Sequence, residues 1–353
     1  MFPALLALAA PGMLFADPAP PGDAPGGSAG DADWLARPVR VGLVWENDGT
    51  LPNFFTSNDR YYTNGLMAHA AWRPDWADRA ADGLLGPVGE TSLSDDSAFG
   101  LALTQRIFTS EDITDKVPGS DDRPYAGSLY VSASLQRAEQ RDAFTATMAH
   151  VQLDAGVVGS WSGAEAVQTF VHSVWPEQFQ PRGWGTQLSN EALVNLRARH
   201  AWRFSAGERE SGLDFQLIPE VSAALGTVDR NVGGSVLVRA GLHMPDDFGP
   251  TTIDAIGSAT GDWPADRRFG GYVFAQAGGR VVEHDLYLDG NTFQNSRSVT
   301  KEPAVGELRF GVVLRLFEHL ECSWSRTYLT DEFEAQTQSV SYGTLSVAYR
   351  RTF

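Results

Sequence analysis

The feature of this chain that most constrains its fold is a long-range alternation of apolar and polar residues. Successive side chains of a β-strand point to opposite faces, so such a segment has one apolar side and one water-facing side. In the clearest case, residues 307–317, the apolar side consists of Leu308, Phe310, Val312, Leu314 and Leu316. The opposite side carries Glu307, Arg309, Gly311 and Arg315. Similar alternation recurs at 128–136, 235–243 and 345–353.

The spacing of these segments predicts an all-β fold, a transmembrane antiparallel β-barrel of about twelve strands of roughly 9–17 residues. We place them near 39–48, 61–73, 97–109, 125–138, 142–158, 191–204, 213–227, 231–243, 269–288, 301–317, 320–334 and 339–353. The mean hydropathy of −0.22 is compatible with this fold, because only every second residue would face lipid. A soluble β-sandwich would also alternate, but long strands and a terminal aromatic, Phe353, favour the barrel.

The ends of the chain and its composition narrow the setting. The apolar residues 1–16 resemble a secretory signal peptide, although they lack Lys and Arg, and a buried N-terminal helix is the alternative. Residues 17–38 read as a flexible lead-in, and 39–353 as the barrel. The single cysteine, Cys322, is interpreted as a small wall residue. A formal charge of −17 argues against nucleic acid as a partner.

An N-terminus in the periplasm places the outer loops near 49–60, 110–124, 159–190, 228–230, 289–300 and 335–338. The turns near 74–96 and 244–268 are then long for the periplasmic side, where short turns are usual. The third outer loop, 159–190, is predicted to contain a short helix that is capped by Ser160 or Ser162 and ends near Pro176. Its apolar stripe is Ala164, Val167, Val171 and Val174, and its polar stripe is Glu165, Gln168 and His172.

Several residues suited to chemistry fall at the predicted outer rim. Asn47 and Asp48 offer oxygen ligands for a hard cation such as calcium, although Asn-Asp-Gly is also an ordinary turn. Arg60 and Thr63 open the second strand and could equally be lumen residues. Lys116 and Arg123 could hold an anionic head group, or Arg123 could pair with Asp121 or Asp122.

His172 is the most suggestive single residue, because a neutral imidazole can take a proton from water. A lone helical histidine can also be structural. The chain has no Gly-x-Ser-x-Gly elbow and no His-Glu-x-x-His spacing. Any hydrolysis is therefore predicted to proceed by activated water and not by a serine nucleophile.

Taken together, these motifs resemble the outer-membrane lipid A 3′-O-deacylases. The matching segments are 46–48, 59–65, 122–127, 171–172, 184–191 and 219–222, and their order runs through most of the chain after residue 39. The resemblance implies a twelve-stranded barrel in the bacterial outer membrane, with an extracellular active site between the barrel wall and a loop helix. It implies hydrolysis of a 3′-O-linked acyloxyacyl group of lipid A by chemistry like that of secreted phospholipase A2.

By this resemblance, His172 is the general base, and Asn47 and Asp48 hold a Ca²⁺ ion that stabilises the oxyanion. Thr63 matches a functional position, and Lys116 matches a family lysine approximately, because the loop differs in length. The family glutamate that follows the histidine has only Glu177 as a candidate, one residue too close and after Pro176. We expect lipid A or lipopolysaccharide as substrate, outer-membrane lipid as surroundings, and a monomer. The alternatives are another lipid esterase or phospholipase, and a pore or non-catalytic structural barrel.

Overall fold

The computed structural model describes residues 39–49, 59–87, 89, 92–174, 179–207, 212–254, 256, 261, 263–264, 267–317 and 319–351. These residues all lie in one unit of the chain, 34–353. The predicted signal peptide, the lead-in, Pro176, Glu177 and the terminal Phe353 lie outside the described residues. Among the described residues, no helix has the length and apolar character needed to cross a bilayer.

Twelve antiparallel strands of the described chain close into a barrel, which confirms the predicted fold and excludes the sandwich. Each strand pairs with its sequence neighbours, and β1 pairs with β12, so that Arg40 lies opposite Arg350. The strands are β1 (Arg40–Asn47), β2 (Tyr61–Trp72), β3 (Ser94–Thr109), β4 (Ala126–Gln140), β5 (Thr145–Val158), β6 (Glu191–Ser205), β7 (Leu213–Gly226), β8 (Asp229–Leu242), β9 (Gly270–Asp285), β10 (Ala304–Leu316), β11 (Leu320–Leu329) and β12 (Ser341–Arg350).

The predicted alternation holds along the barrel wall. On β10, Leu308, Phe310 and Leu314 are exposed on the outer surface, whereas Arg315 is buried inside. Cys322 on β11 is a half-buried free thiol in the wall. Inside the barrel, charged side chains pair with one another, as in Arg40–Glu321 at 2.5 Å. An apolar outer surface around a charged lumen is the arrangement that suits a barrel in lipid.

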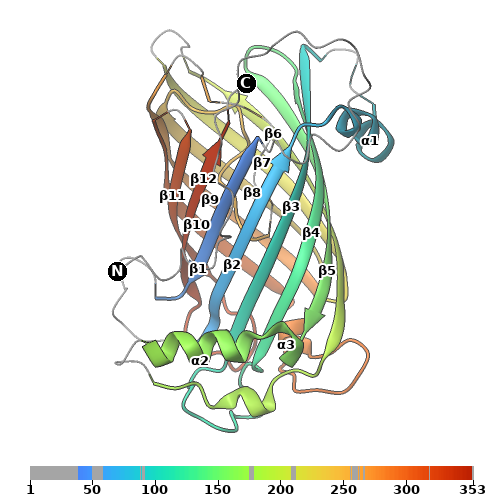
Figure 1. Ribbon diagram of the computed structural model, residues 1–353, viewed down its shortest axis with the longest axis vertical. Coiled ribbons are helices and arrows are strands. Elements are labelled where there is room, and N and C mark those ends of the chain that lie inside the picture. The colour runs from blue at the N-terminus through green and yellow to red at the C-terminus, as the bar shows by residue number, and fades with distance from the viewer. Residues whose placement is uncertain are drawn as a thin grey trace, which may run out of the picture. The chain divides into compact units, whose positions relative to one another are not determined.

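The barrel has two unlike ends, shown in Figure 1. We call the end where β1 begins and β12 ends the terminal end, and the opposite end the loop end. The loop end carries η3 (Ser160–Ser162), α2 (Ala164–Val174), η4 (Gly183–Thr186) and α3 (Leu286–Asp289). It is closed by an apolar cluster that includes Tyr62, Phe108, Tyr287 and Phe333. Apolar side chains are therefore packed together on the side that carries the long loops.

The two turns that are too long for a simple barrel have separate structural roles at the terminal end. The first contains α1 (Asp75–Leu85), which packs Ala77 and Ala81 against the outward-facing Leu135 of β4. The described residues of the second, between β8 and β9, fold into the lumen as a plug. Ile253 of the plug packs against Val44 and Met67 on the inner wall.

Three inward-facing arginines hold this plug. Arg239 forms an ion pair with Asp247, Arg315 donates to the carbonyl oxygen of Pro264 at 2.7 Å, and Arg350 donates to that of Gly261 at 2.6 Å. Deeper in the lumen, the plug residue Asp254 forms an ion pair with Arg106 at 3.1 Å. Arginine presents several fixed donors, so each can hold backbone and carboxylate oxygens together.

Candidate active site

Four of the predicted rim residues, Asn47, Asp48, Thr63 and His172, lie outside the barrel wall, on the side that α2 covers. Ala164 at the start of α2 packs with Ile107 of β3, Tyr125 and Trp184. Gly163 occupies the N-cap position, because its carbonyl oxygen accepts from the backbone N–H of Val167 at 3.1 Å, and the preceding Ser162 accepts from the backbone N–H of Ala164 at 3.3 Å. The helix rests over Gly127 of β4, where an added Cβ would lie 2.2 Å from Ala164 Cβ. A glycine is therefore required there for the close approach of helix and wall.

A β-bulge brings Thr63 to this outer face. The register of β2 against β3 shifts between Tyr62 and Asn64, so Thr63 is an extra residue in the strand. Tyr62 points inward and donates to Glu46 at 2.6 Å, whereas the Thr63 hydroxyl lies 2.8 Å from that of Thr109. Bulges commonly redirect a side chain next to a functional site. The regular alternation that places Met67 on the inner face would also turn Thr63 inward, and the extra residue of the bulge brings Thr63 to the outer face instead.

His172 is buried between α2 and the wall, and both of its ring nitrogens have partners. Nε2 lies 2.7 Å from Asp59 Oδ2, and Nδ1 lies 2.6 Å from the carbonyl oxygen of Phe179. Burial lowers the pKa of His172, but the hydrogen bond and charge of Asp59 and the Phe179 carbonyl outweigh it, so the pKa is raised overall. The site therefore stabilises the imidazolium that forms when His172 accepts a proton.

Asp48 lies next to this pair in the turn after β1. Its Oδ2 accepts a hydrogen bond from the backbone N–H of Arg60 at 2.9 Å, while Oδ1 is buried without a hydrogen-bond partner. Burial and the nearby charge of Asp59 raise the pKa of Asp48 well above its usual value. An unsatisfied carboxylate oxygen beside a second carboxylate is a setting that a bound cation would stabilise.

The donor set around Asp48 fits a hard cation. The Asn47 amide donates to the Thr63 carbonyl oxygen at 2.7 Å, and its Oδ1 accepts from Gly49 N at 2.8 Å, which fixes the amide oxygen at the rim. Within the described ranges, no group of three or more His, Cys, Asp or Glu side chains forms a metal site. A calcium ion here would need further oxygen ligands from amides, backbone carbonyls or water, which calcium accepts readily.

Two of the predicted cations lie away from these residues. Arg123 is buried on the lumen side, where it pairs with Glu332 at 2.9 Å and stacks over Phe108 at 5.1 Å. The partner considered from the sequence, Asp122, instead accepts from the backbone N–H of Arg123 at 2.7 Å. Lys116 is exposed in the loop between β3 and β4. None of the contacts that define the site around His172 involves Lys116.

Asp59 and Gln168 are site residues to which the sequence reasoning gave no role. Gln168 donates to Asp59 Oδ2 at 3.0 Å, and its own carbonyl oxygen accepts from the Trp184 indole at 2.9 Å. Asp59 thus bridges His172 and Gln168, which are four residues apart on one face of α2. The spacing of the polar stripe was a signal for Gln168, and the position of Asp59 next to Arg60 was the signal for Asp59.

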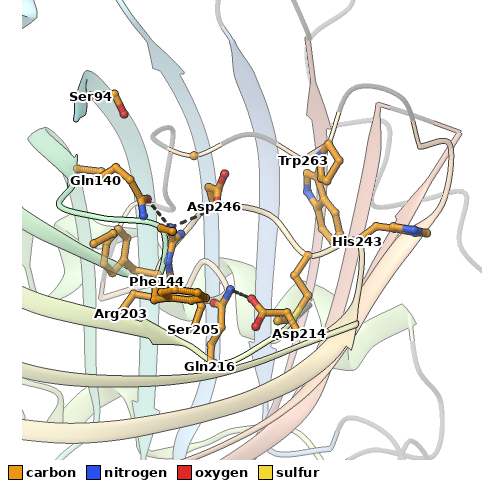
Figure 2. A pocket seen from close by; sticks show the side chains of 18 of the residues that line it. Ser94, Gln140, Phe144, Arg203, Ser205, Asp214, Gln216, His243, Asp246 and Trp263 are labelled. Atoms are coloured by element: carbon orange, nitrogen blue, oxygen red, sulfur yellow. Dashed lines mark hydrogen bonds and ion pairs between the residues drawn. The ribbon is translucent and has the colours of Figure 1, made fainter. Parts of the chain in front are cut away.

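Two cavities lie elsewhere in the barrel, and neither is lined by Asp48, Asp59, Gln168 or His172. One, of about 750 Å³, opens at the terminal end and is lined by Gln140, Arg203, Asp214 and Trp263 among others, shown in Figure 2. The other, of about 230 Å³, lies in the lumen among charged side chains that include Arg106, Arg197 and Asp254. We place the candidate site on the outer wall because His172, Asp59 and Asp48 meet there.

Comparison with known proteins gives one family. The family model described as outer membrane protein LpxR matches residues 5–351. The solved structure of LpxR from Salmonella typhimurium aligns with a TM-score of 0.65 at 19% identity, over 88% of this chain and 100% of that chain. The β domain of the Bordetella autotransporter BrkA aligns with a TM-score of 0.45 at 9% identity, over 88% and 98% of the two chains. No curated protein sequence matches significantly.

Proposed function

Because the chain belongs to the LpxR family of outer-membrane proteins, the lipid A 3′-O-deacylase family, we propose that it hydrolyses an ester-linked acyl chain of lipid A. The protein is an outer-membrane barrel, with the loop end at the extracellular side. The observation that carries the proposal is the hydrogen-bonded pair His172–Asp59 beside the buried carboxylate of Asp48. This group lies on the outer face of the wall, where a membrane lipid would meet it.

In this proposal His172 is the general base. Asp59 accepts a hydrogen bond from Nε2–H and fixes the tautomer, so that the unprotonated Nδ1 takes a proton from the attacking water. Nδ1 faces the Phe179 carbonyl oxygen, and two acceptors cannot both be satisfied by a neutral imidazole, which has one N–H. Water must therefore replace that carbonyl at Nδ1 during turnover. Asp59 acts as a positioning residue, and so does Gln168 through Asp59.

Asn47 and Asp48 are the residues proposed to hold calcium. A calcium ion at this position would polarise the ester carbonyl and stabilise the developing oxyanion. Support for this assignment comes from the unsatisfied Oδ1 atom of Asp48 and the adjacent Asp59 carboxylate. Thr63 is proposed to hold the rim geometry through its contacts with Asn47 and Thr109. Arg60 and Lys116 are proposed to attract the anionic groups of lipid A.

The decisive experiment is mass spectrometry of lipid A from cells with and without the protein. Cells that make it should release the 3′-O-linked acyl group, and His172→Ala should lower the rate by at least about 100-fold, the usual contribution of a general base. His200→Ala, on the outward side of β6, is the matched control, since His200 contacts Trp202 and not the site. Unchanged acyl release by His172→Ala would reject the mechanism.

A lipid esterase of different head-group preference is the second candidate, because the residues named above recognise an ester and not a sugar. Purified protein offered lipid A and glycerophospholipid side by side would separate the two. Preferred release of fatty acid from glycerophospholipid would leave the His172 mechanism in place and replace the substrate.

A further inference from the structure

Helix α2 has three faces with different surroundings. At 3.6 residues per turn, Ala164, Gln168 and His172 share one face, and the structure buries all three against the barrel wall. Glu165, Thr169 and Ser173 share the next face, which is exposed and polar. The remaining face is apolar, and it is exposed as well.

The exposed apolar face is extended by residues on both sides of the helix. Phe170 is 62% exposed and Val174 is 58% exposed, and the neighbouring Trp161 and Phe179 are 65% and 67% exposed. We use the name α2 apolar patch for the set of residues Trp161, Val167, Phe170, Val171, Val174 and Phe179. A helix that buries glutamine and histidine while it exposes valine and phenylalanine is the reverse of a helix on a water-soluble protein.

The patch lies on the side of the wall that faces lipid. Beneath the helix are Ile107 of β3 and its register partner Gly127 of β4. Four residues further along the same strands, about 13 Å at the usual rise, Leu103 and Val131 are paired and about half exposed on the outer surface. Figure 1 shows α2 lying across the ends of the strands at the loop end. Between these two pairs, Gln105 uses its amide to bind the carbonyl oxygen of Ser162 at 2.8 Å, so the apolar outer wall ends directly beside α2.

We propose that the α2 apolar patch is embedded among the acyl chains of the outer leaflet. The polar face with Glu165, Thr169 and Ser173 then contacts water, as in helices that lie in a membrane interface. The helix that carries His172 would be seated on lipid, and an acyl chain would reach the site sideways from the leaflet. The proposed contact with lipid is argued only from the exposed α2 apolar patch and its position on the wall. The route for the acyl chain rests in addition on the proposed function.

Site-directed spin labelling of the full chain in lipid vesicles tests the seating of the helix. Cys322→Ala removes the only thiol, and Val174→Cys or Phe170→Cys then places one label on the patch. Leu103→Cys is the control for the lipid-facing wall, and Thr169→Cys is the control for the polar face of the same helix. Collisions with molecular oxygen report lipid, and collisions with a water-soluble nickel complex report water.

We expect the labels at 170 and 174 to match the label at 103, with nickel accessibility several-fold lower than at 169. Nickel accessibility equal to that at 169 would overturn the proposal and place the patch in water. Shielding from both oxygen and nickel would also overturn it, because a protein partner or a second copy would then cover the patch. None of these measurements needs turnover, so their failure is distinct from a failure of the proposed esterase function.

The acyl route is tested by activity. Phe170→Asp and Val174→Asp should lower turnover of lipid A in a bilayer several-fold, and should leave turnover of a short-chain, water-soluble ester within about twofold. Equal losses on both substrates would overturn the lateral route, since the changes would then have disturbed the site itself.

Discussion

Single residues at the rim set what the site can do. His172 contacts an acceptor at each nitrogen, and the carboxylate of Asp59 is one of them. Asp48 keeps one oxygen without a partner while burial and Asp59 oppose its ionisation. The surroundings therefore favour the charged form of His172 and the neutral form of Asp48. The imidazole is stabilised when it is charged, and the carboxylate needs a cation before it can be charged at low cost.

The His172–Asp59 pair predicts a specific pH dependence. The pKa of His172 is raised, and only the neutral imidazole accepts a proton, so activity should fall on the acid side at a higher pH than for an ordinary histidine. Asp59→Asn removes the charge that raises this pKa, so the acid limb should move to lower pH. The same change should lower kcat by roughly 10- to 100-fold, the usual cost of losing a group that orients an imidazole.

Rate profiles of wild-type and Asp59→Asn protein measured from acid to neutral pH would check this. Asp289, which pairs with His284 at 3.3 Å away from α2, offers the control Asp289→Asn, for which no shift of the acid limb is expected. An acid limb that stays in place in Asp59→Asn would show that Asp59 does not set the pKa of His172.

Asp48 predicts calcium-dependent stability. Its raised pKa means that ionisation of Asp48 above that pKa destabilises the cation-free fold. Calcium should therefore raise the unfolding temperature of the wild type. At a calcium concentration of 100 times Kd, the free energy of unfolding should increase by about 2.7 kcal/mol. Asp48→Asn should be the more stable protein in chelator and should lose most of the calcium response. A calcium response equal in the two proteins would remove Asp48 from the ligand set.

At the scale of elements, the site depends on how closely α2 approaches the wall. The bulge in β2 presents Thr63, and Gly127 of β4 leaves space for Ala164 and Ser162. The amphipathic pattern of α2 also has a meaning that only its position reveals. Gln168 and His172 of its polar stripe pack against protein, whereas Glu165 and much of its predicted apolar stripe are exposed.

Gly127→Ala should detach α2 without unfolding the barrel. The added Cβ would lie 2.2 Å from Ala164 Cβ and 2.4 Å from Ser162 Oγ, so the helix must move. Overpacking of this kind costs about 1–3 kcal/mol, and turnover should fall at least tenfold as His172 is displaced from Asp59.

Gly83→Ala in α1, where the added Cβ meets nothing within 4 Å, is the matched control and should keep full activity. The altered migration of folded barrels in unheated gels would report that both variants are folded. Normal turnover by Gly127→Ala would show that the approach of α2 to β4 is not needed for activity.

At the scale of the whole molecule, the described part of the chain places side chains and a plug segment inside the barrel. The apolar cluster packs at the loop end, and the described residues of the plug between β8 and β9 lie in the lumen at the terminal end. Arg239 fastens this plug through Asp247 and through the carbonyl oxygen of Pro245 at 3.2 Å. A lumen filled in this way leaves the outer wall as the surface on which a lipid is handled.

The plug predicts low ion conductance in planar bilayers. Arg239→Ala leaves Asp247 buried without its partner, a loss of about 3–5 kcal/mol for a buried pair, and should increase the frequency of open events. Arg230→Ala, at an exposed ion pair with Glu283, is the control and should conduct as the wild type does. Steady, large conductance by the wild-type protein would contradict a seated plug.

The sequence by itself determined the barrel, its strands and the helix in the third outer loop. These follow from periodicity, which each strand carries locally, because inward and outward residues alternate whatever the partner strand is. Local pattern also marked Asn47, Asp48 and His172 as candidates, each beside an ordinary structural alternative, whereas the functional role expected for Thr63 came from the family resemblance. The turns near 74–96 and 244–268 were recognised as too long for the periplasmic side. No local pattern indicated that the first forms α1 and that the second enters the lumen.

Only the tertiary structure decided which of these residues meet. Asp59 and His172 are 113 residues apart, and Arg123 and Glu332 are 209 apart. The first pair forms on the outer wall and the second in the lumen. The physical reason is that a side chain's partner depends on barrel closure, on a one-residue bulge and on the seating of a loop helix. None of these leaves a periodic trace in the amino-acid sequence, so chemistry at the rim became specific only when the wall and α2 were placed together.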